Sequence, residues 1–308
     1  MKSKHLIGLE NISSKDINEI IDTGFLFKEV LDRPIKRVPS LMGKNIVNLF
    51  FENSTRTKIS FELAEKRLSA DIVNFASSSS SVKKGESLKD TIQNIHAMKI
   101  DCVVMRHPVP GSCIQLTNYV DSVIVNAGDG THEHPTQALL DMMSIKEHFG
   151  EIKNLKIGIV GDILHSRVAL SNIFGLIKLG AKVKVCGPPH LIQKDIEDLN
   201  VEVEYDIDNL IEWADAINVL RIQKERMGVG IIPSIREYRR FFGITSDRIK
   251  NHKKEIVIMH PGPINRGVEI DSSVADSNQS IILNQVLNGV AVRMSVLYLL
   301  LGNNDLKS

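Results

Sequence analysis

The sequence predicts an α/β protein of two doubly wound domains, each a parallel sheet flanked by helices. Three observations favour this class. Short apolar runs alternate with helical stretches along the chain, as in sheets built from strand–helix units. The 308 residues suffice for two domains of about 150 residues each. A hydrophobic content of 43% and a charged content of 24% are those of a globular protein.

The first half of the chain begins with a capped amphipathic helix near Ser14. Four β-rich runs follow, and each precedes a plausible helix; we expect strands at 46–51, 71–75, 101–105 and 122–126. Residues 76–87 are rich in serine and lysine and cannot contribute to a core. This segment is therefore expected to be a surface loop.

The second half repeats the alternation, with strands expected at 155–161, 181–187, 201–204, 215–220 and 255–260. A helix at 134–150 is apolar around most of its circumference, which is typical of a connector buried by both domains. The last helix, 284–302, is expected to cross back to the first domain. The predicted domains are therefore 1–135 with 285–308, and 136–284.

Charge and cysteine content argue against several classes of protein. Lysine and arginine total 38 against 37 acidic residues, so no basic field exists to hold nucleic acid or an anionic membrane. Cys102, Cys113 and Cys186 form no CxxC pair and are expected to be buried, inert thiols. The first residues do not resemble a signal peptide, and no apolar run approaches a membrane span, so we expect a cytoplasmic protein.

The strongest local feature is the sequence Asn-Ser-Thr-Arg-Thr at 53–57, where a β-rich run ends and a helix begins. A helix N-terminus offers unpaired N–H groups and partial positive charge, and Arg56 adds a planar fork for phosphate oxygens. The same residue types are also ordinary helix caps, so this segment alone leaves a simple cap open.

Five further segments with arginine or histidine follow predicted strands or begin predicted helices: 106–111, 128–141, 161–172, 220–227 and 259–270. In open α/β sheets, ligands bind outside the carboxyl ends of the strands. We therefore expect these segments and the 53–57 turn to converge on one crevice.

The order and spacing of STRT, KKGES, HPTQ, the GD and HSR turn, RIQKER and HPGPINRG resemble the catalytic chain of aspartate carbamoyltransferase over essentially the whole length. The resemblance implies transfer of the carbamoyl group of carbamoyl phosphate to the α-amino group of L-aspartate, giving N-carbamoyl-L-aspartate and phosphate, in the second step of pyrimidine biosynthesis. It implies that 1–135 with 285–308 binds carbamoyl phosphate and that 136–284 binds aspartate. No metal or cofactor is required.

By the same resemblance, Thr57, Arg106 and His134 contact the carbamoyl oxygen, where negative charge develops in the tetrahedral species. Gln137 lies near the carbamoyl nitrogen, and backbone carbonyls of the HPGP turn accept from its NH2 group. The implied carbamoyl phosphate site comprises Ser54, Thr55, Arg56, Thr57, Arg106, His134, Gln137, Gly262 and Pro263. The implied catalytic residues are Arg56, Thr57, Lys84, Arg106 and His134.

The implied aspartate site comprises Lys84, Arg167, Arg221 and Gln223, with Arg221 selecting the side-chain carboxylate. In the family, Ser80 and Lys84 enter the site from a neighbouring subunit, and the serine run leaves Ser81 as an alternative to Ser80. A homotrimer with shared active sites would then be the smallest active assembly. Association with a regulatory chain or with dihydroorotase stays open, because the chain has HPGPINRG where some members have HPLPR.

Four other functional interpretations fit the sequence less well. Ornithine carbamoyltransferase shares STRT and HPTQ but should have HCLP where this chain has HPGP. The adjacent spacing of His132, Glu133 and His134 does not aim them at one zinc ion. The turn GIVGD lacks the GxGxxG of a dinucleotide site. A catalytically inactive scaffold is disfavoured because every expected cationic and hydroxyl position is filled. His165 and His260 could each simply satisfy backbone groups beside a turn.

Overall fold

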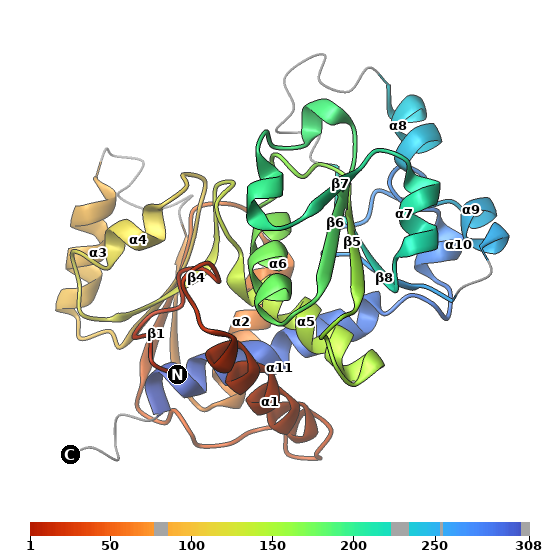
Figure 1. Cartoon of the computed structure of the whole chain (residues 1–308). Helices are drawn as coiled ribbons and strands as arrows, with labels where there is room; N and C mark the ends of the chain where they lie inside the picture. Colours follow the sequence, from red (N-terminus) through yellow and green to blue (C-terminus); the bar gives the residue numbers. More distant parts are fainter. Residues whose placement is uncertain (77–85, 223–233, 253–254, 303–308) are drawn as a thin grey trace. The chain divides into compact units, whose positions relative to one another are not determined.

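The computed structural model describes residues 1–76, 86–222, 234–252 and 255–302, which form two compact units (Figure 1). Unit 1 is Met1–Leu140 together with the residues from Leu287 onward, and unit 2 is Asp141–Val286. The division falls inside two helices, α5 (Pro135–Phe149) and α11 (Ile282–Leu301). The predicted helices at 134–150 and 284–302 are therefore present. That both domains bury the first of them stays a prediction.

Unit 1 is built on a parallel sheet, as predicted, and its strand order is β2-β1-β3-β4. The strands are β1 (Asn45–Phe50), β2 (Asp71–Ala76), β3 (Cys102–His107) and β4 (Val123–Asp129). The helices wholly within this unit are α1 (Ser14–Leu31), α2 (Thr55–Arg67), α3 (Leu88–Ala97) and α4 (Ser112–Leu116). Most of the predicted 76–87 loop lies outside the described residues.

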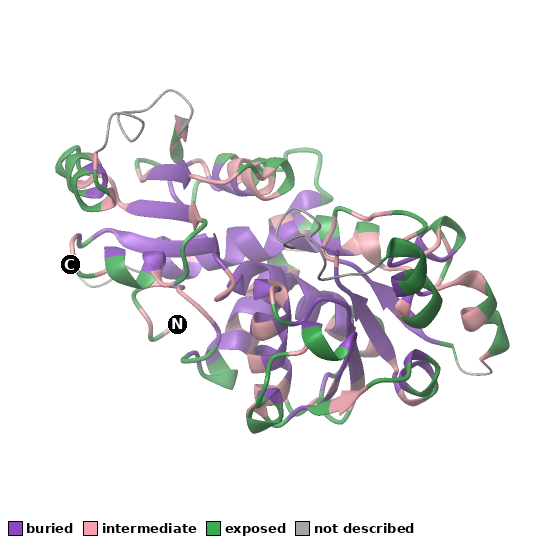
Figure 2. Cartoon of the chain, turned by 90° about the horizontal axis from the view of Figure 1, so that it is seen from above, coloured by how far each residue is buried: buried purple, intermediate pink, exposed green. Residues whose placement is uncertain are grey.

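Helices cover both faces of this sheet. Leu49 of β1 belongs to a core cluster with Ile92 of α3 and Leu116 of α4. The preceding residue, Asn48, points to the other face and hydrogen-bonds Glu65 of α2. Burial on both faces explains why the strands read as continuous apolar runs. Figure 2 shows this burial along the strands.

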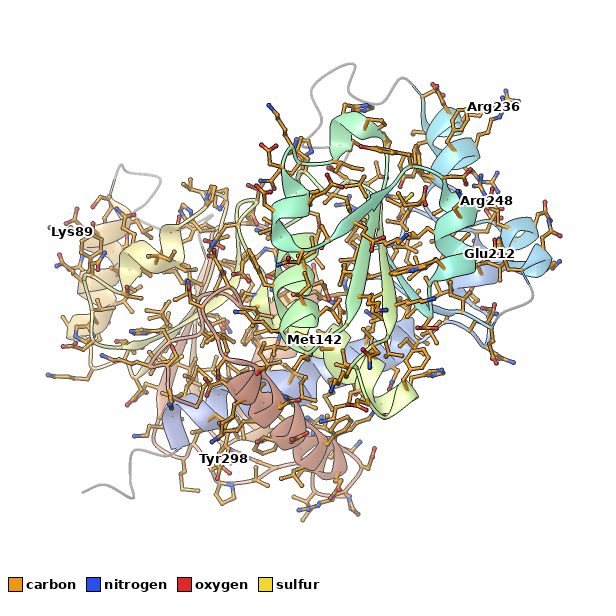
Figure 3. The ribbon with its side chains drawn as sticks, viewed as in Figure 1. Lys89, Met142, Glu212, Arg236, Arg248 and Tyr298 are labelled. Carbon is orange, nitrogen blue, oxygen red and sulfur yellow. The ribbon has the colours of Figure 1, made fainter. Side chains whose placement is uncertain are left out.

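Helix α11 returns to unit 1, which confirms the predicted crossing back. The Ser295 hydroxyl donates to the carbonyl of Ile20 in α1 at 2.7 Å, and the rings of Phe27 and Tyr298 meet edge to face at 5.5 Å (Figure 3 labels Tyr298). The helix is long and apolar enough to cross a membrane, but 61% of its most apolar window is buried inside the molecule. That burial is typical of a core helix.

Unit 2 also contains a parallel sheet, as predicted, and its strand order is β7-β6-β5-β8-β9. The strands are β5 (Lys156–Val160), β6 (Lys182–Cys186), β7 (Glu202–Glu204), β8 (Ala216–Val219) and β9 (Val257–Met259). The α-helices are α6 (Arg167–Lys178), α7 (Ile207–Trp213), α8 (Ile235–Phe242), α9 (Ser246–Asn251) and α10 (Ser272–Ala275), with 3-10 turns η3 (Pro189–Leu191) and η4 (Ile196–Leu199). Helices α6 and α7 lie on opposite faces of the sheet (Figure 1).

Glycine in β5 serves packing between helix and sheet. A Cβ at Gly158 would lie 2.9 Å from Cδ2 of Leu210 in α7, so a larger residue would push the helix away. Close packing of α7 against the sheet therefore explains the first glycine of GIVGD without a bound dinucleotide.

Glu65 is a buried carboxyl group whose ionisation opposes folding. Its side chain accepts one hydrogen bond from Asn48 at 2.8 Å, yet burial raises its pKa to about 7. The unfolded carboxyl group ionises at lower pH, so the folded state loses stability as pH rises from the unfolded to the folded pKa, and the loss is complete above about 7. The penalty at pH 8 is of order 3 kcal/mol.

Glu65→Gln is therefore expected to raise the urea midpoint strongly at pH 8 and little at pH 5, because glutamine cannot ionise but can still accept from Asn48. Glu62→Gln, on the more exposed side of α2, is the matched control and should change the midpoint little at either pH. Equal stabilisation by Glu65→Gln at both pH values would contradict this account.

Candidate functional site

Unit 1 places predicted site residues at the point where its strand order reverses. The order β2-β1-β3-β4 changes direction between β1 and β3. The 53–57 turn follows β1, and Arg106 is the second-last residue of β3, paired with Phe50 in the ladder. Ligands of doubly wound sheets bind outside the carboxyl ends at such a switch point. Arg56 and Arg106 thus lie in segments that flank the position that the topology favours.

The turn after β1 presents the first turn of α2 with its polar groups accessible. Ser54 is the N-cap, but its side chain makes no capping hydrogen bond. Thr55 and Arg56 are exposed, and Thr57 is half-buried. The first turn contains no acidic residue that would oppose an anion. This geometry favours a phosphate-binding turn over a turn that only caps the helix.

Hydrogen bonds hold Arg106 in place. Its Nε lies 3.2 Å from the Glu52 carboxylate, and its Nη1 donates to the carbonyl of Ala127 in β4 at 3.2 Å. Only 14% of the Arg106 side chain and 19% of the Glu52 side chain are exposed. These contacts fix the guanidinium group at the carboxyl edge of the sheet.

His134 and Gln137 begin α5 after a tightly bonded turn. Both residues are buried, and the Gln137 N–H donates to the His134 carbonyl at 3.0 Å. The adjacent acidic residue does not face a metal, because the Glu133 carboxylate accepts the N–H groups of Leu9 and Glu10 at 2.7 and 3.1 Å.

His132 turns instead to Asp129, 3.1 Å away, and this hydrogen bond raises the His132 pKa. Across the described parts of the chain, no cluster of three or more His, Cys, Asp or Glu side chains is arranged to hold a metal ion.

Unit 2 shows a second switch point, between β5 and β8 in the order β7-β6-β5-β8-β9. Arg167 is the first residue of α6, which follows β5, and is only 5% exposed. The cap of α6 is Ser166, whose side chain accepts the Ala169 N–H. His165 bonds through Nδ1 to the buried Asp162 at 2.9 Å, so it braces the turn that precedes Arg167.

Arg221 and the HPGP turn lie at the ends of the next two strands. Arg221 follows β8 and is half-buried, and His260 follows β9. The Asn265 side chain donates to the carbonyl of Ile222 at 3.2 Å, which ties the HPGP segment to the Arg221 segment. Three adjacent strands, β5, β8 and β9, therefore carry Arg167, Arg221 and the Gly262–Pro263 turn on one edge of one sheet.

Several predicted site residues lie outside the described residues: Ser80, Ser81, Lys84 and Gln223. The convergence of all six polar segments on one crevice stays a prediction. The structure brings together three of them at the carboxyl edge of the first sheet, and three at the carboxyl edge of the second.

The cysteines are buried, as predicted, and unbonded to one another. Burial raises the pKa of Cys186 to about 12 and that of Cys102 well above its usual value. Neither thiol can supply a thiolate nucleophile near neutral pH.

Comparisons with known proteins agree with this geometry. The family model for the carbamoyl-P binding domain of aspartate/ornithine carbamoyltransferase matches residues 4–147, and that for the Asp/Orn binding domain matches residues 153–300. The aspartate carbamoyltransferase catalytic subunit of Christiangramia forsetii is 62% identical over 296 residues, which are 96% of this chain and 96% of the relative. The chain belongs to the aspartate carbamoyltransferase family.

Solved structures of aspartate carbamoyltransferases share the fold. The catalytic subunit of M. jannaschii aspartate transcarbamoylase is 37% identical with a TM-score of 0.84, over 98% of this chain and 99% of that one. Aspartate transcarbamoylase from Trypanosoma cruzi in complex with carbamoyl phosphate and aspartate is 29% identical with a TM-score of 0.87, over 96% and 95% of the two chains.

The residues that hold the arginines and the HPGP turn in place were not predicted from the sequence. Glu52, which pairs with Arg106, stands directly before the 53–57 turn and could have been noticed as an acidic residue among cationic neighbours. Asn265 and Glu269 gave no signal, because their partners are recognisable only in the folded chain.

Proposed function

We propose that this chain transfers the carbamoyl group from carbamoyl phosphate to the α-amino group of L-aspartate, producing N-carbamoyl-L-aspartate and phosphate for pyrimidine synthesis. One observation carries the proposal: each sheet has arginines at its switch point. The first switch point combines Arg106 with the N-terminus of α2, and the second combines Arg167 with Arg221. One half-site suits the phosphate group of an acyl phosphate, and the other suits a dicarboxylate.

Unit 1 binds carbamoyl phosphate in this proposal. The phosphate accepts hydrogen bonds from the N–H groups of the first turn of α2, from hydroxyl groups of Ser54, Thr55 and Thr57, and from Arg56. The carbamoyl oxygen accepts from Thr57, Arg106 and His134. Gln137 and the carbonyls of Gly262 and Pro263 hold the carbamoyl nitrogen. The family model matched to residues 4–147, described as a carbamoyl-P binding domain, supports this division.

The chemical step needs no covalent enzyme intermediate. The neutral amine of aspartate attacks the carbamoyl carbon, a C–N bond forms, and the C–O bond to phosphate breaks. The amine proton passes to the departing phosphate. Negative charge on the carbamoyl oxygen grows in the tetrahedral species, and each fixed donor to that oxygen contributes roughly 3 kcal/mol. Holding both reactants in alignment removes a further barrier of about 7 to 11 kcal/mol.

Unit 2 binds aspartate, with Arg167 and Arg221 on its two carboxylates and Gln223 assisting. Guanidinium groups match carboxylates in charge and in planar geometry. Ornithine, the substrate of the alternative family branch, carries a cationic side chain that Arg221 would repel. The HPGP turn also lacks the cysteine expected in that branch, and Cys102, Cys113 and Cys186 are all buried elsewhere.

The active assembly in this proposal is a homotrimer in which Ser80, or Ser81, and Lys84 of one subunit complete the site of its neighbour. Exposed apolar side chains support an interface near this segment. Val73 is 50% exposed on the edge strand β2, shortly before the serine-rich segment, and Ile59 and Leu63 of α2 are 51% and 37% exposed. A cytoplasmic location is supported by three buried free thiols. A regulatory chain or dihydroorotase remains a possible further partner.

The proposal is tested by incubating the purified chain with carbamoyl phosphate and either L-aspartate or L-ornithine, with no added metal, and assaying ureido product colorimetrically. We expect carbamoyl aspartate and negligible citrulline. Turnover of ornithine without turnover of aspartate would reverse the assignment. A metal chelator should leave the rate unchanged.

A further inference from the structure

The turn that follows β9 is held by a buried histidine–glutamate pair. His260 and Glu269 are 2% and 0% exposed, and His260 Nε2 lies 3.2 Å from a Glu269 carboxylate oxygen. On the other side of the ring, Nδ1 accepts the Gly262 N–H at 2.7 Å. Because Nδ1 is an acceptor, the ring proton resides on Nε2 and is donated to Glu269. Both ring nitrogens of a neutral imidazole are thereby used.

The pair fixes the turn at two places in its main chain. The Glu269 oxygen that faces His260 also accepts the N–H of Asn265 at 2.5 Å. The N–H groups of Gly262 and Asn265, one on each side of Pro263, therefore both donate hydrogen bonds to this pair. The Asn265 side chain extends the arrangement to the carbonyl of Ile222, next to Arg221.

The backbone of His260 is anchored separately. Its N–H donates to Gln285 Oε1 at 3.0 Å, and the Gln285 side chain donates to Asp141 Oδ1 at 2.7 Å. The other Asp141 oxygen accepts from Asn172 and Asn218 at 2.9 and 3.1 Å. This buried network holds the backbone of His260, so the ring keeps a fixed position between Glu269 and Gly262.

We propose that His260, oriented by Glu269, is a positioning residue that sets the carbonyl groups of Gly262 and Pro263 toward the carbamoyl NH2 group. The inference rests on the proposed function. The fixed N–H groups of Gly262 and Asn265 belong to the peptide units that directly precede and directly follow the two units carrying these carbonyls. Because both flanking units are held, the two carbonyl groups between them are preorganised and need little rearrangement when the ligand binds. The turn touches only the carbamoyl end of the ligand. Loosening it weakens recognition of that end and leaves the phosphate end, held by α2, unaffected.

Two variants of His260 separate its two hydrogen bonds. In His260→Asn, the amide oxygen falls near the position of Nδ1 and can still accept from Gly262. In His260→Gln, the longer side chain reaches toward Glu269 and leaves the Gly262 N–H without its acceptor. The ligands are inorganic phosphate and phosphonoacetamide, a stable analogue of carbamoyl phosphate in which a methylene replaces the bridging oxygen. Binding is measured by calorimetry on the full chain, and folding by thermal midpoint.

We expect phosphonoacetamide to bind at least about tenfold more weakly to His260→Gln and within about threefold of the native affinity to His260→Asn, the scale of one lost hydrogen bond. Phosphate affinity should be unchanged in both variants. The same ordering should appear in kcat/KM for carbamoyl phosphate. Equal losses in the two variants, or parallel losses of phosphate and phosphonoacetamide affinity, would overturn the positioning role.

A measurement on the native protein guards against variants that fail to fold. Long-range 1H–15N spectra report which ring nitrogen carries the proton, and we expect a neutral His260 protonated at Nε2. The Nδ1 tautomer or a doubly protonated ring would overturn the inference. Neither the calorimetric binding measurement nor the spectroscopic assignment of the His260 tautomer requires turnover. If the protein formed no carbamoyl aspartate, that result would therefore count against the proposed function and not against this inference.

Discussion

Replacing Arg106 with alanine is expected to lower kcat about a hundred- to a thousandfold, because it removes a fixed donor from the oxygen on which charge develops. The side chain is positioned for this task before substrate binds: Glu52 and the Ala127 carbonyl hold it at the end of β3. Since the interaction strengthens in the transition state, kcat and kcat/KM should fall together. Steady-state kinetics with both substrates varied would measure this.

The control for Arg106→Ala is Arg37→Ala, which removes another arginine of unit 1, one that bonds Ser69 on the surface. It should retain native kcat. Thermal midpoints should show that both variants remain folded, although Arg106→Ala also removes the ion pair between Arg106 and Glu52. A folded Arg106→Ala variant with kcat within about threefold of native would contradict the proposed role in the transition state.

Mixing Arg106→Ala with Lys84→Ala subunits is expected to restore activity that neither variant has alone. Each parent should retain below about one per cent of native activity. In a cyclic trimer with shared sites, a site is intact when its own subunit supplies Arg106 and its neighbour supplies Lys84. Random mixing of equal amounts then makes about one quarter of the sites native. The recovered rate, measured after exchange of differently tagged subunits, should approach that fraction.

Mixing Arg106→Ala with Arg56→Ala provides the matched control. Both residues belong to unit 1 of the same subunit, so every site in the mixture lacks one of them and no recovery is expected. If mixed trimers form and the Arg106 and Lys84 variants still fail to complement, each site is contained within one subunit. Recovery in both mixtures would indicate that neither substitution had inactivated its own site.

The strands were predictable because burial on both faces leaves a direct trace in the sequence. In β1, the predicted 46–51 and the observed Asn45–Phe50 differ by one residue at each end. The helix caps were also readable: Ser13, next to the predicted Ser14, accepts the Asp16 N–H and begins α1. The anion-binding turn at 53–57 could be proposed because a helix N-terminus attracts anions through its own backbone.

The strand order could not be read in the same way. Strands β2 and β3 both pair with β1 in parallel, one on each side, and this arrangement creates the switch point. No local sequence feature indicates that these two strands are the neighbours of β1. The position of Arg106 relative to the 53–57 turn follows from that pairing. The same holds in unit 2, where β8 pairs with β5 although β6, β7 and α7 lie between them in the chain.

The α/β class, the successive strands, the helix that carries Arg56 and the likeness to aspartate carbamoyltransferase could all be predicted from residue order alone, because periodicity and short motifs are local properties of the chain. The contacts that hold the functional side chains in place became visible only in the folded chain. Glu133 holds the N–H of Leu9, 124 positions away, and Gln285 reaches Asp141 across 144 positions. Such partners meet only after the chain has folded. A polar group that is buried without a hydrogen bond costs free energy, so the stable fold pairs polar groups that are distant in the sequence.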